Sequence, residues 1–144
     1  MRIRILVISN NPTRPSFRLR IGAFLPFLRE NGIDAEVAKL PARMGARRKL
    51  FARAADFNAV LLHKKRLNLL DAWALRHKAR HIIYDFDDAV MYSPHDPERD
   101  SRSHFSPFRR TARLVDTIIA GNSYLADHAR RFNPNVHIIP TGLD

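Results

Sequence analysis

Residues 59–85 read AVLLHKKRLNLLDAWALRHKARHIIYD, and this stretch holds two short apolar runs, 59–63 and 81–85, on either side of a segment at 68–78. In that segment apolar residues recur at spacings of three and four, which is typical of a helix with one buried face. Short apolar runs separated by such a helix indicate a βαβ unit, whose two strands lie parallel in one sheet. The stretch therefore predicts an α/β fold.

The rest of the chain repeats this alternation. Further strands are expected at 3–9, 35–40, 117–120 and 136–139, and further helices at 16–31, 42–55, 107–115 and 123–132. We expect a Rossmann-like, doubly wound parallel sheet with helices on both faces, in three α/β/α layers.

Two interruptions of this pattern are also predicted. Pro26 lies within the first helix and should kink it, because its ring clashes with the carbonyl group of Gly22. Residues 92–106 carry no periodic apolar face and are expected to form one long loop. Ser106 would then cap the next helix, with Pro107 in its first turn.

Size and charge limit the classes of protein. A chain of 144 residues suits one compact domain, and it contains no cysteine, which excludes disulfides and thiolate chemistry. No apolar run is long enough for a membrane span or a signal peptide, so we expect a cytoplasmic protein. The formal net charge of +11, from 25 Lys and Arg against 14 Asp and Glu, predicts an anionic partner. Nucleic acid, an acidic lipid surface and a phosphorylated substrate all fit that charge.

An acidic cluster marks the end of the fourth predicted strand, where open parallel sheets bind ligands. The residues are Tyr84-Asp85-Phe86-Asp87-Asp88. Their carboxylates can accept hydrogen bonds from sugar hydroxyls, act as a base or bind a hard cation such as Mg²⁺. The alternative is that one aspartate caps a turn and the others face solvent.

Basic and polar residues fall at the same edge. Segment 9–20 lacks the glycines of a G-x-G-x-x-G turn, which argues against NAD(P) binding, but it carries Arg14, Arg18 and Arg20 near a helix start. Guanidinium and free backbone N–H groups can hold a phosphate or carboxylate there, and Arg18 is the preferred candidate over a solvated face. His63, at the end of the third strand, is the histidine best placed to reach the crevice. No spacing of the histidines favours a metal site.

Two further segments leave alternatives open. Gly121-Asn122-Ser123-Tyr124 can offer N–H donors to an anion or a sugar hydroxyl, or can simply cap a helix. Residues 42–53 form a basic amphipathic segment with five Lys or Arg side chains beside Met44, Leu50 and Phe51. Such a helix can contact an anionic membrane surface, or it can pack on the sheet with a charged outer face.

Four segments, in this order, resemble the amino-terminal domain of family 4 (group 1) glycosyltransferases. They are Arg18-Leu19-Arg20-Ile21, Tyr84-Asp85-Phe86-Asp87-Asp88-Ala89, Ala120-Gly121-Asn122-Ser123-Tyr124-Leu125-Ala126 and Ile139-Pro140-Thr141-Gly142-Leu143-Asp144. The resemblance implies one half of a GT-B architecture, with this domain binding acceptor and a second domain binding a nucleotide-sugar donor such as a UDP- or GDP-sugar. It also implies retaining sugar transfer with no required metal or other cofactor. The chain departs from many relatives in lacking a Gly-Gly pair after the first strand.

The resemblance divides the chain into a Rossmann-like domain, 1–139, and the start of a linker, 140–144, to a donor domain without which this chain is expected to be inactive. Asp87 and Asp88 would then orient the acceptor hydroxyl. Substrate-binding roles fall to Arg18, Arg20, His63, Asp85, Asn122 and Tyr124. The acceptor would be a sugar or a lipid-linked molecule.

The alternative from another class is a basic α/β module that binds nucleic acid without catalysis, which the charge of +11 motivates. Aromatic residues interleaved with the basic ones would favour it, but in segment 42–53 only Phe51 provides this. We therefore expect no nucleic-acid partner.

Overall fold

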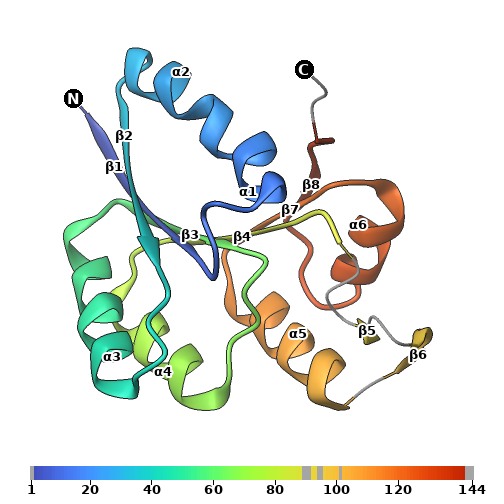
Figure 1. Ribbon diagram of the computed structural model, residues 1–144. Helices are drawn as coiled ribbons and strands as arrows, with labels where there is room; N and C mark the ends of the chain where they lie inside the picture. The colour runs from blue at the N-terminus through green and yellow to red at the C-terminus, as the bar shows by residue number, and fades with distance from the viewer. Residues whose placement is uncertain (1, 89–91, 94–95, 101, 142–144) are drawn as a thin grey trace.

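The computed structural model describes residues 2–88, 92–93, 96–100 and 102–141, with only the backbone described between 92 and 104. The chain alternates strands and helices for most of its length (Figure 1). The strands are β1 (Ile3–Ser9), β2 (Ile33–Lys39), β3 (Ala59–His63), β4 (Ile82–Phe86), β5 (Tyr92–Ser93), β6 (Asp96–Asp100), β7 (Thr117–Ala120) and β8 (Val136–Ile138). The α-helices are α1 (Pro15–Arg20), α2 (Leu25–Glu30), α3 (Met44–Ala52), α4 (Leu69–Lys78), α5 (Arg102–Leu114) and α6 (Ser123–Arg130), with short 3-10 helices η1 (Gly22–Phe24) and η2 (Arg53–Asp56).

Six strands form one parallel sheet in the order β2-β1-β3-β4-β7-β8. This confirms the predicted α/β, Rossmann-like fold. From β1 the chain crosses to β2 on one side, and from β3 it moves to β4 on the other. The strand order therefore reverses between β1 and β3, and their carboxyl ends flank the crevice in which open parallel sheets bind ligands.

The two faces of the sheet are covered unequally. The larger core lies between the sheet and α3, α4, α5 and α6, and includes Leu62, Tyr84, Phe86 and Phe108, all fully buried. The smaller core lies under α1 and α2 and is built on Val7, Phe17 and Ile21. In Figure 1 the two groups of helices lie on opposite sides of the sheet. The strongly apolar strands follow from this double coverage.

Pro26 coincides with a break in the first helical segment, as predicted. The segment divides into α1, η1 and α2, with Pro26 in the first turn of α2. A proline is tolerated at that place because the N–H group it lacks would have no partner within the helix. The segment ends at Asn31, followed by Gly32 at φ 82°, as its Asn-Gly pair indicates.

The predicted loop at 92–106 is wrong. A short antiparallel pair, β5 with β6, lies within it, and α5 begins at Arg102 with Pro107 inside the helix. Phe105 and Phe108, three residues apart, both pack edge-on against Phe132. Burial of these rings extends the helix on the amino-terminal side of the proline, at the cost of one backbone hydrogen bond.

None of the helices in the described part of the chain combines the length and hydropathy that a membrane crossing needs.

Candidate functional site

Three neighbouring strands present polar side chains at their carboxyl ends. Ser9 pairs in register with His63, and His63 with Asp85. All three residues are at most 4% exposed, although strand ends commonly face solvent. Buried polar groups of this kind are retained when they are hydrogen-bonded, so each needs a partner at this edge.

Arg20 and Asp85 form a buried ion pair beneath the site. Arg20 Nη2 lies 2.6 Å and Nε 3.0 Å from the Asp85 carboxylate oxygens, with side-chain exposures of 3% and 5%. Arg20 Nη1 also donates to the carbonyl oxygen of Ile139 at 2.9 Å. Burial raises the pKa of Asp85, but hydrogen bonds from His63 and Arg20 outweigh it, so the pKa lies below its usual value. Asp85 is therefore an ionised, internally paired carboxylate.

The His63 ring is fixed from two sides. Its Nδ1 lies 3.1 Å from Asp85 Oδ2, and its ring packs edge-on to Phe17 with centroids 5.5 Å apart. An ionised carboxylate can only accept, so Nδ1 carries the proton and, in a neutral ring, Nε2 is left as an acceptor. Nε2 lies 3.5 Å from Ser16 Oγ at the start of α1. His63 thus presents an oriented acceptor toward the space beside Ser16.

Asp87 lies at the centre of a second group of contacts. Its carboxylate accepts from Ser16 Oγ at 3.2 Å and Thr141 Oγ1 at 3.3 Å, and Lys64 Nζ is 3.7 Å away. Asp88 is 65% exposed at its side chain and is ion-paired with Lys64. The two aspartates therefore share one lysine, and Asp87 is the more enclosed of the pair.

Lys64 occupies an unusual backbone conformation. It is a non-glycine residue with φ 61°, and its N–H donates to the carbonyl oxygen of Asp85 at 2.8 Å. The left-handed region costs a residue with a side chain about 1–2 kcal/mol, and such strain is concentrated at functional sites. Here it turns the chain sharply after β3 and brings the Lys64 ammonium group back to Asp87 and Asp88.

A hollow of about 590 Å³ opens between the ends of β1 and β3. It is lined by Ser9, Asn10, Asn11, Arg14, Ser16, His63, Lys64 and Arg66. A smaller hollow of about 200 Å³ shares Asn10, Lys64 and Arg66 with it and adds Lys65. The larger hollow has the size of a small-molecule site, and its lining is polar and basic.

The structure brings together some of the predicted site residues and separates others. Arg20, His63, Asp85, Asp87 and Asp88 meet at this edge. Arg18 instead lines another hollow, with Pro15, Leu19, Gly22 and Ala23. Asn122 caps α6, since its side chain accepts from the Leu125 N–H at 2.9 Å, and Tyr124 lies 54% exposed on that helix. Asn122 therefore takes the capping role that the sequence left as an alternative.

Sequence reasoning missed Ser16, Lys64 and Arg66 as site residues. A signal for two of them was present, because the basic run Lys64-Lys65-Arg66 directly follows β3 at the ligand-binding edge. Ser16 gave no such signal. It lies 47 and 71 positions from His63 and Asp87, and only the fold brings them into contact.

Gly121 leaves room for Asp87, and we expect a Gly121→Ala change to lower the free energy of unfolding by about 1–3 kcal/mol. A Cβ atom at position 121 would lie 2.9 Å from Asp87 Cβ and 3.0 Å from Asp87 Cα, so the backbone of the acidic segment would have to shift. Urea denaturation measures the change. Gly45→Ala is the matched control, because a Cβ there meets nothing within 4 Å and should stabilise helix α3 slightly. Equal effects at the two positions would contradict the tight contact at Asp87.

Comparison with known proteins bears on the fold. The chain is similar to a solved alpha-glucosyltransferase in complex with UDP and a 13-mer DNA containing an HMU base, with a TM-score of 0.60 over 100% of this chain and 44% of that one. The chain has a glycosyltransferase-like fold. At 11% sequence identity the likeness concerns the fold alone, and this chain spans less than half the length of that enzyme. No protein-family model and no curated protein sequence matches the chain.

Proposed function

We propose that this chain is the amino-terminal, acceptor-binding half of a retaining glycosyltransferase of the GT-B type. The full enzyme would move a sugar from a UDP- or GDP-sugar to a hydroxyl group. The observation that carries the proposal is His63, whose Nε2 is oriented by Asp85 toward a polar hollow at the point where the strand order reverses. The glycosyltransferase-like fold supports it.

In this proposal the acceptor hydroxyl donates a hydrogen bond to His63 Nε2 or to Asp87. Either contact would direct an oxygen lone pair toward the donor, and correct orientation of two reactants is a large part of enzymatic rate enhancement. In this proposal Arg20 supports the site without contacting the acceptor, because its Nε, Nη1 and Nη2 atoms all donate to protein oxygens. It is a positioning residue, holding Asp85 and through it the His63 ring.

The nucleotide-sugar donor would be held mainly by a second domain, as the resemblance to family 4 implies. The leaving nucleoside diphosphate develops negative charge in the transition state, and oriented cations stabilise that charge. No metal or other cofactor is part of the proposal.

Product stereochemistry tests the retaining mechanism. We would incubate the full-length protein with an α-linked UDP- or GDP-sugar and follow the anomeric proton of the first-formed product by NMR. An α product supports the proposal. A β product would replace it with direct displacement, in which the His63–Asp85 pair would act as a general base.

Nucleic-acid binding without sugar transfer is the second candidate. It is favoured by the charge of +11 and by the fact that the similar alpha-glucosyltransferase was solved with DNA. It predicts salt-sensitive oligonucleotide binding together with no response to nucleotide sugars.

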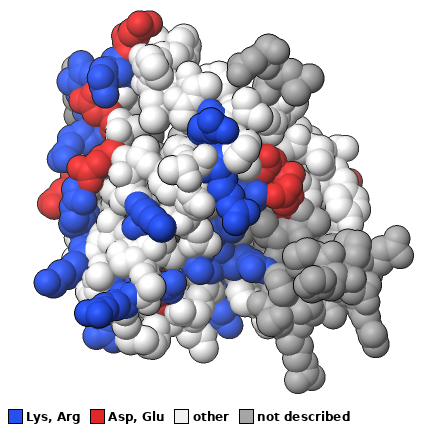
Figure 2. All heavy atoms as spheres, in the orientation of Figure 1, with Lys and Arg blue, Asp and Glu red and all other residues white. Residues whose placement is uncertain are grey.

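We also propose peripheral membrane contact through residues 42–53, because exposed apolar residues of a neighbouring helix lie beside this basic segment. Helix α3 packs against α4, on which Leu69, Leu70 and Trp73 are 70%, 52% and 64% exposed, and Met44 on α3 is 55% exposed. Exposed apolar residues beside a basic helix suit the interface of an anionic bilayer. In Figure 2, Lys and Arg side chains are numerous on the lower left of the molecule, where Figure 1 places α3.

Replacing Trp73 with Ala is expected to weaken binding to phosphatidylglycerol vesicles about tenfold, because an aromatic side chain supplies much of the buried apolar area. Vesicle sedimentation measures it. Phe27→Ala is the control, because Phe27 is 61% exposed on α2, on the opposite face of the sheet. Equal binding by the wild type and both variants would argue against contact through α3 and α4.

A further inference from the structure

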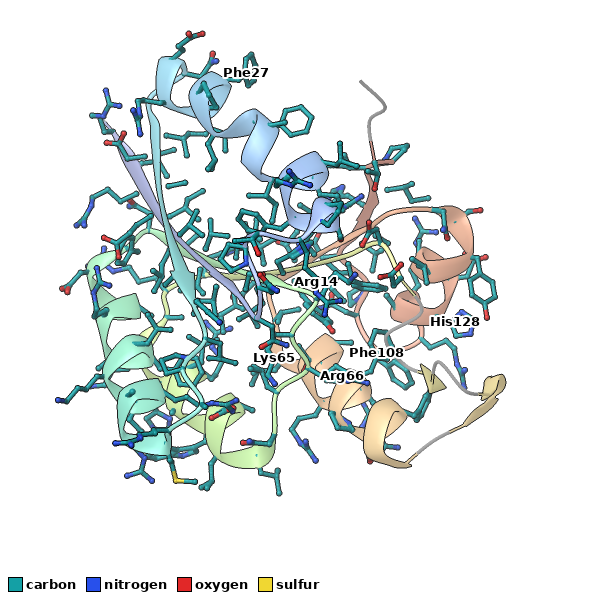
Figure 3. All side chains as sticks on the ribbon, viewed as in Figure 1. Arg14, Phe27, Lys65, Arg66, Phe108 and His128 are labelled. Carbon is teal, nitrogen blue, oxygen red and sulfur yellow. The ribbon has the colours of Figure 1, made fainter. Side chains whose placement is uncertain are left out.

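Positive charge concentrates in the hollow beside His63. Arg14 comes from the segment after β1, and Lys64 and Arg66 come from the segment after β3. Lys65 lines the adjoining hollow with Arg66. Figure 3 shows Arg14, Lys65 and Arg66 at this edge of the sheet, and Figure 2 shows Lys and Arg side chains across the middle of the same face. Four cations from two loops thus line two neighbouring hollows.

The described acidic side chains beside these cations already have basic partners. Asp87 and Asp88 are both engaged by Lys64. On the other side Asp71 is paired with Arg47 at 2.6 Å. Burial lowers the pKa of Lys65, and the charge of Arg47 lowers it too, against the opposing effect of Asp71. Burial and neighbouring cations therefore raise the electrostatic energy of the charged Lys65 side chain, and an anion placed beside it would relieve that cost.

The lining also suits a phosphoryl group chemically. Guanidinium groups bind phosphate oxygens through paired N–H donors, and an ammonium group adds a mobile point charge. Asn10 and Ser16 contribute amide and hydroxyl groups to the same lining. A volume of about 590 Å³ accommodates a sugar-sized molecule together with its phosphate.

We propose that this hollow binds a phosphoryl group of the acceptor, so that the acceptor substrate is a phosphorylated sugar or alcohol. The inference rests on the proposed glycosyl transfer and adds the chemical class of the acceptor. The phosphate lies among Arg14, Lys64 and Arg66, and the reacting hydroxyl lies at the His63 end of the same hollow. A free sugar phosphate and a glycerophosphate headgroup both carry the required group.

Calorimetric titration of the 144-residue chain tests the proposal, with inorganic pyrophosphate, glucose 1-phosphate and glycerol 3-phosphate as probes. We expect pyrophosphate to bind and each of Arg14→Gln and Arg66→Gln to weaken it about tenfold. Arg48→Gln, which removes the same charge from the exposed face of α3, should leave binding unchanged. Thermal unfolding of each variant shows whether a loss of binding arises from a loss of folding.

The outcomes separate the sources of phosphate. Stronger binding of glucose 1-phosphate supports a sugar-phosphate acceptor, and stronger binding of glycerol 3-phosphate supports a headgroup. Absence of pyrophosphate binding, or an equal loss in Arg48→Gln, would overturn the proposal. So would displacement of pyrophosphate by a short DNA oligonucleotide at lower concentration than by either small phosphate. Failure of the proposed function would appear separately, as absent nucleotide-sugar turnover by the full-length protein.

Discussion

Asp85→Asn is expected to lower the free energy of unfolding by about 3–5 kcal/mol, because it leaves the buried Arg20 guanidinium without its counter-ion. Both side chains are at most 5% exposed and joined by a two-oxygen contact. The change also removes the acceptor that orients His63 Nδ1. Urea denaturation followed by circular dichroism measures the effect.

Asp88→Asn is the matched control for that change. Asp88 lies three residues away but is 65% exposed at its side chain, where a salt bridge contributes about 0–1 kcal/mol. If both variants lowered the free energy of unfolding by less than about 1 kcal/mol, the Arg20–Asp85 pair would not stabilise the fold as proposed. Combining Asp85→Asn with Arg20→Met should recover part of the loss, since the second change removes the unpaired charge.

The pH dependence of this effect follows from the lowered pKa of Asp85. A carboxyl group whose pKa is lower in the folded state contributes stability above its unfolded pKa of about 3.9 and loses it as the pH falls through the folded value. The stability difference between wild type and Asp85→Asn should therefore be full at pH 7 and should shrink below about pH 4. A difference that stayed constant down to pH 2 would contradict the ion pair.

Asp87→Asn is expected to lower kcat/KM for sugar transfer by the full-length enzyme at least about 100-fold. The neutral amide no longer holds the hydroxyl group of the acceptor substrate in the orientation that the carboxylate gives it. The change conserves shape, so the free energy of unfolding should move by less than about 1 kcal/mol. Transfer from the nucleotide sugar is measured by release of nucleoside diphosphate.

Asp127→Asn provides the control for activity. Asp127 lies on α6 with its side chain 76% exposed and should alter neither turnover nor stability. A loss of less than fivefold in Asp87→Asn would remove this residue from the proposed acceptor site. A large loss that followed a drop in stability would point to folding instead.

Much of the sheet could be predicted from sequence. The strands predicted at 3–9, 59–63 and 117–120 agree with β1, β3 and β7. Buried parallel strands are short, continuous apolar runs, and such runs fit few other secondary structures. The carboxyl ends of β3 and β4 then place His63 and Asp85 at one edge without further information.

The preference for Arg18 over Arg20 shows where sequence reasoning ends. Both arginines lie in the short helix α1. Arg20 is three residues after the buried Phe17 and pairs with Asp85, whereas Arg18 is exposed. Which of two nearby arginines meets a buried carboxylate depends on tertiary packing, which a periodic pattern does not contain.

The helix start predicted at Pro107 is wrong because tertiary packing overrides a local sequence signal. A proline after serine is a strong local signal for a helix start, yet packing of Phe105 and Phe108 on Phe132 outweighs it. Ser16 and Lys64 were missed for another reason: their contacts with Asp87 and Asp88 depend on one left-handed turn at Lys64 and on pairing across distant parts of the chain.

The most direct test of glycosyl transfer is nucleoside diphosphate release by the protein expressed from its complete reading frame. The assay would supply UDP- and GDP-sugars one at a time, with and without sugar phosphates as acceptors. We predict release from at least one donor, stimulated by an acceptor and abolished by Asp87→Asn. No release from any donor, combined with salt-sensitive oligonucleotide binding by the same protein, would contradict the account and leave a basic nucleic-acid-binding domain in its place.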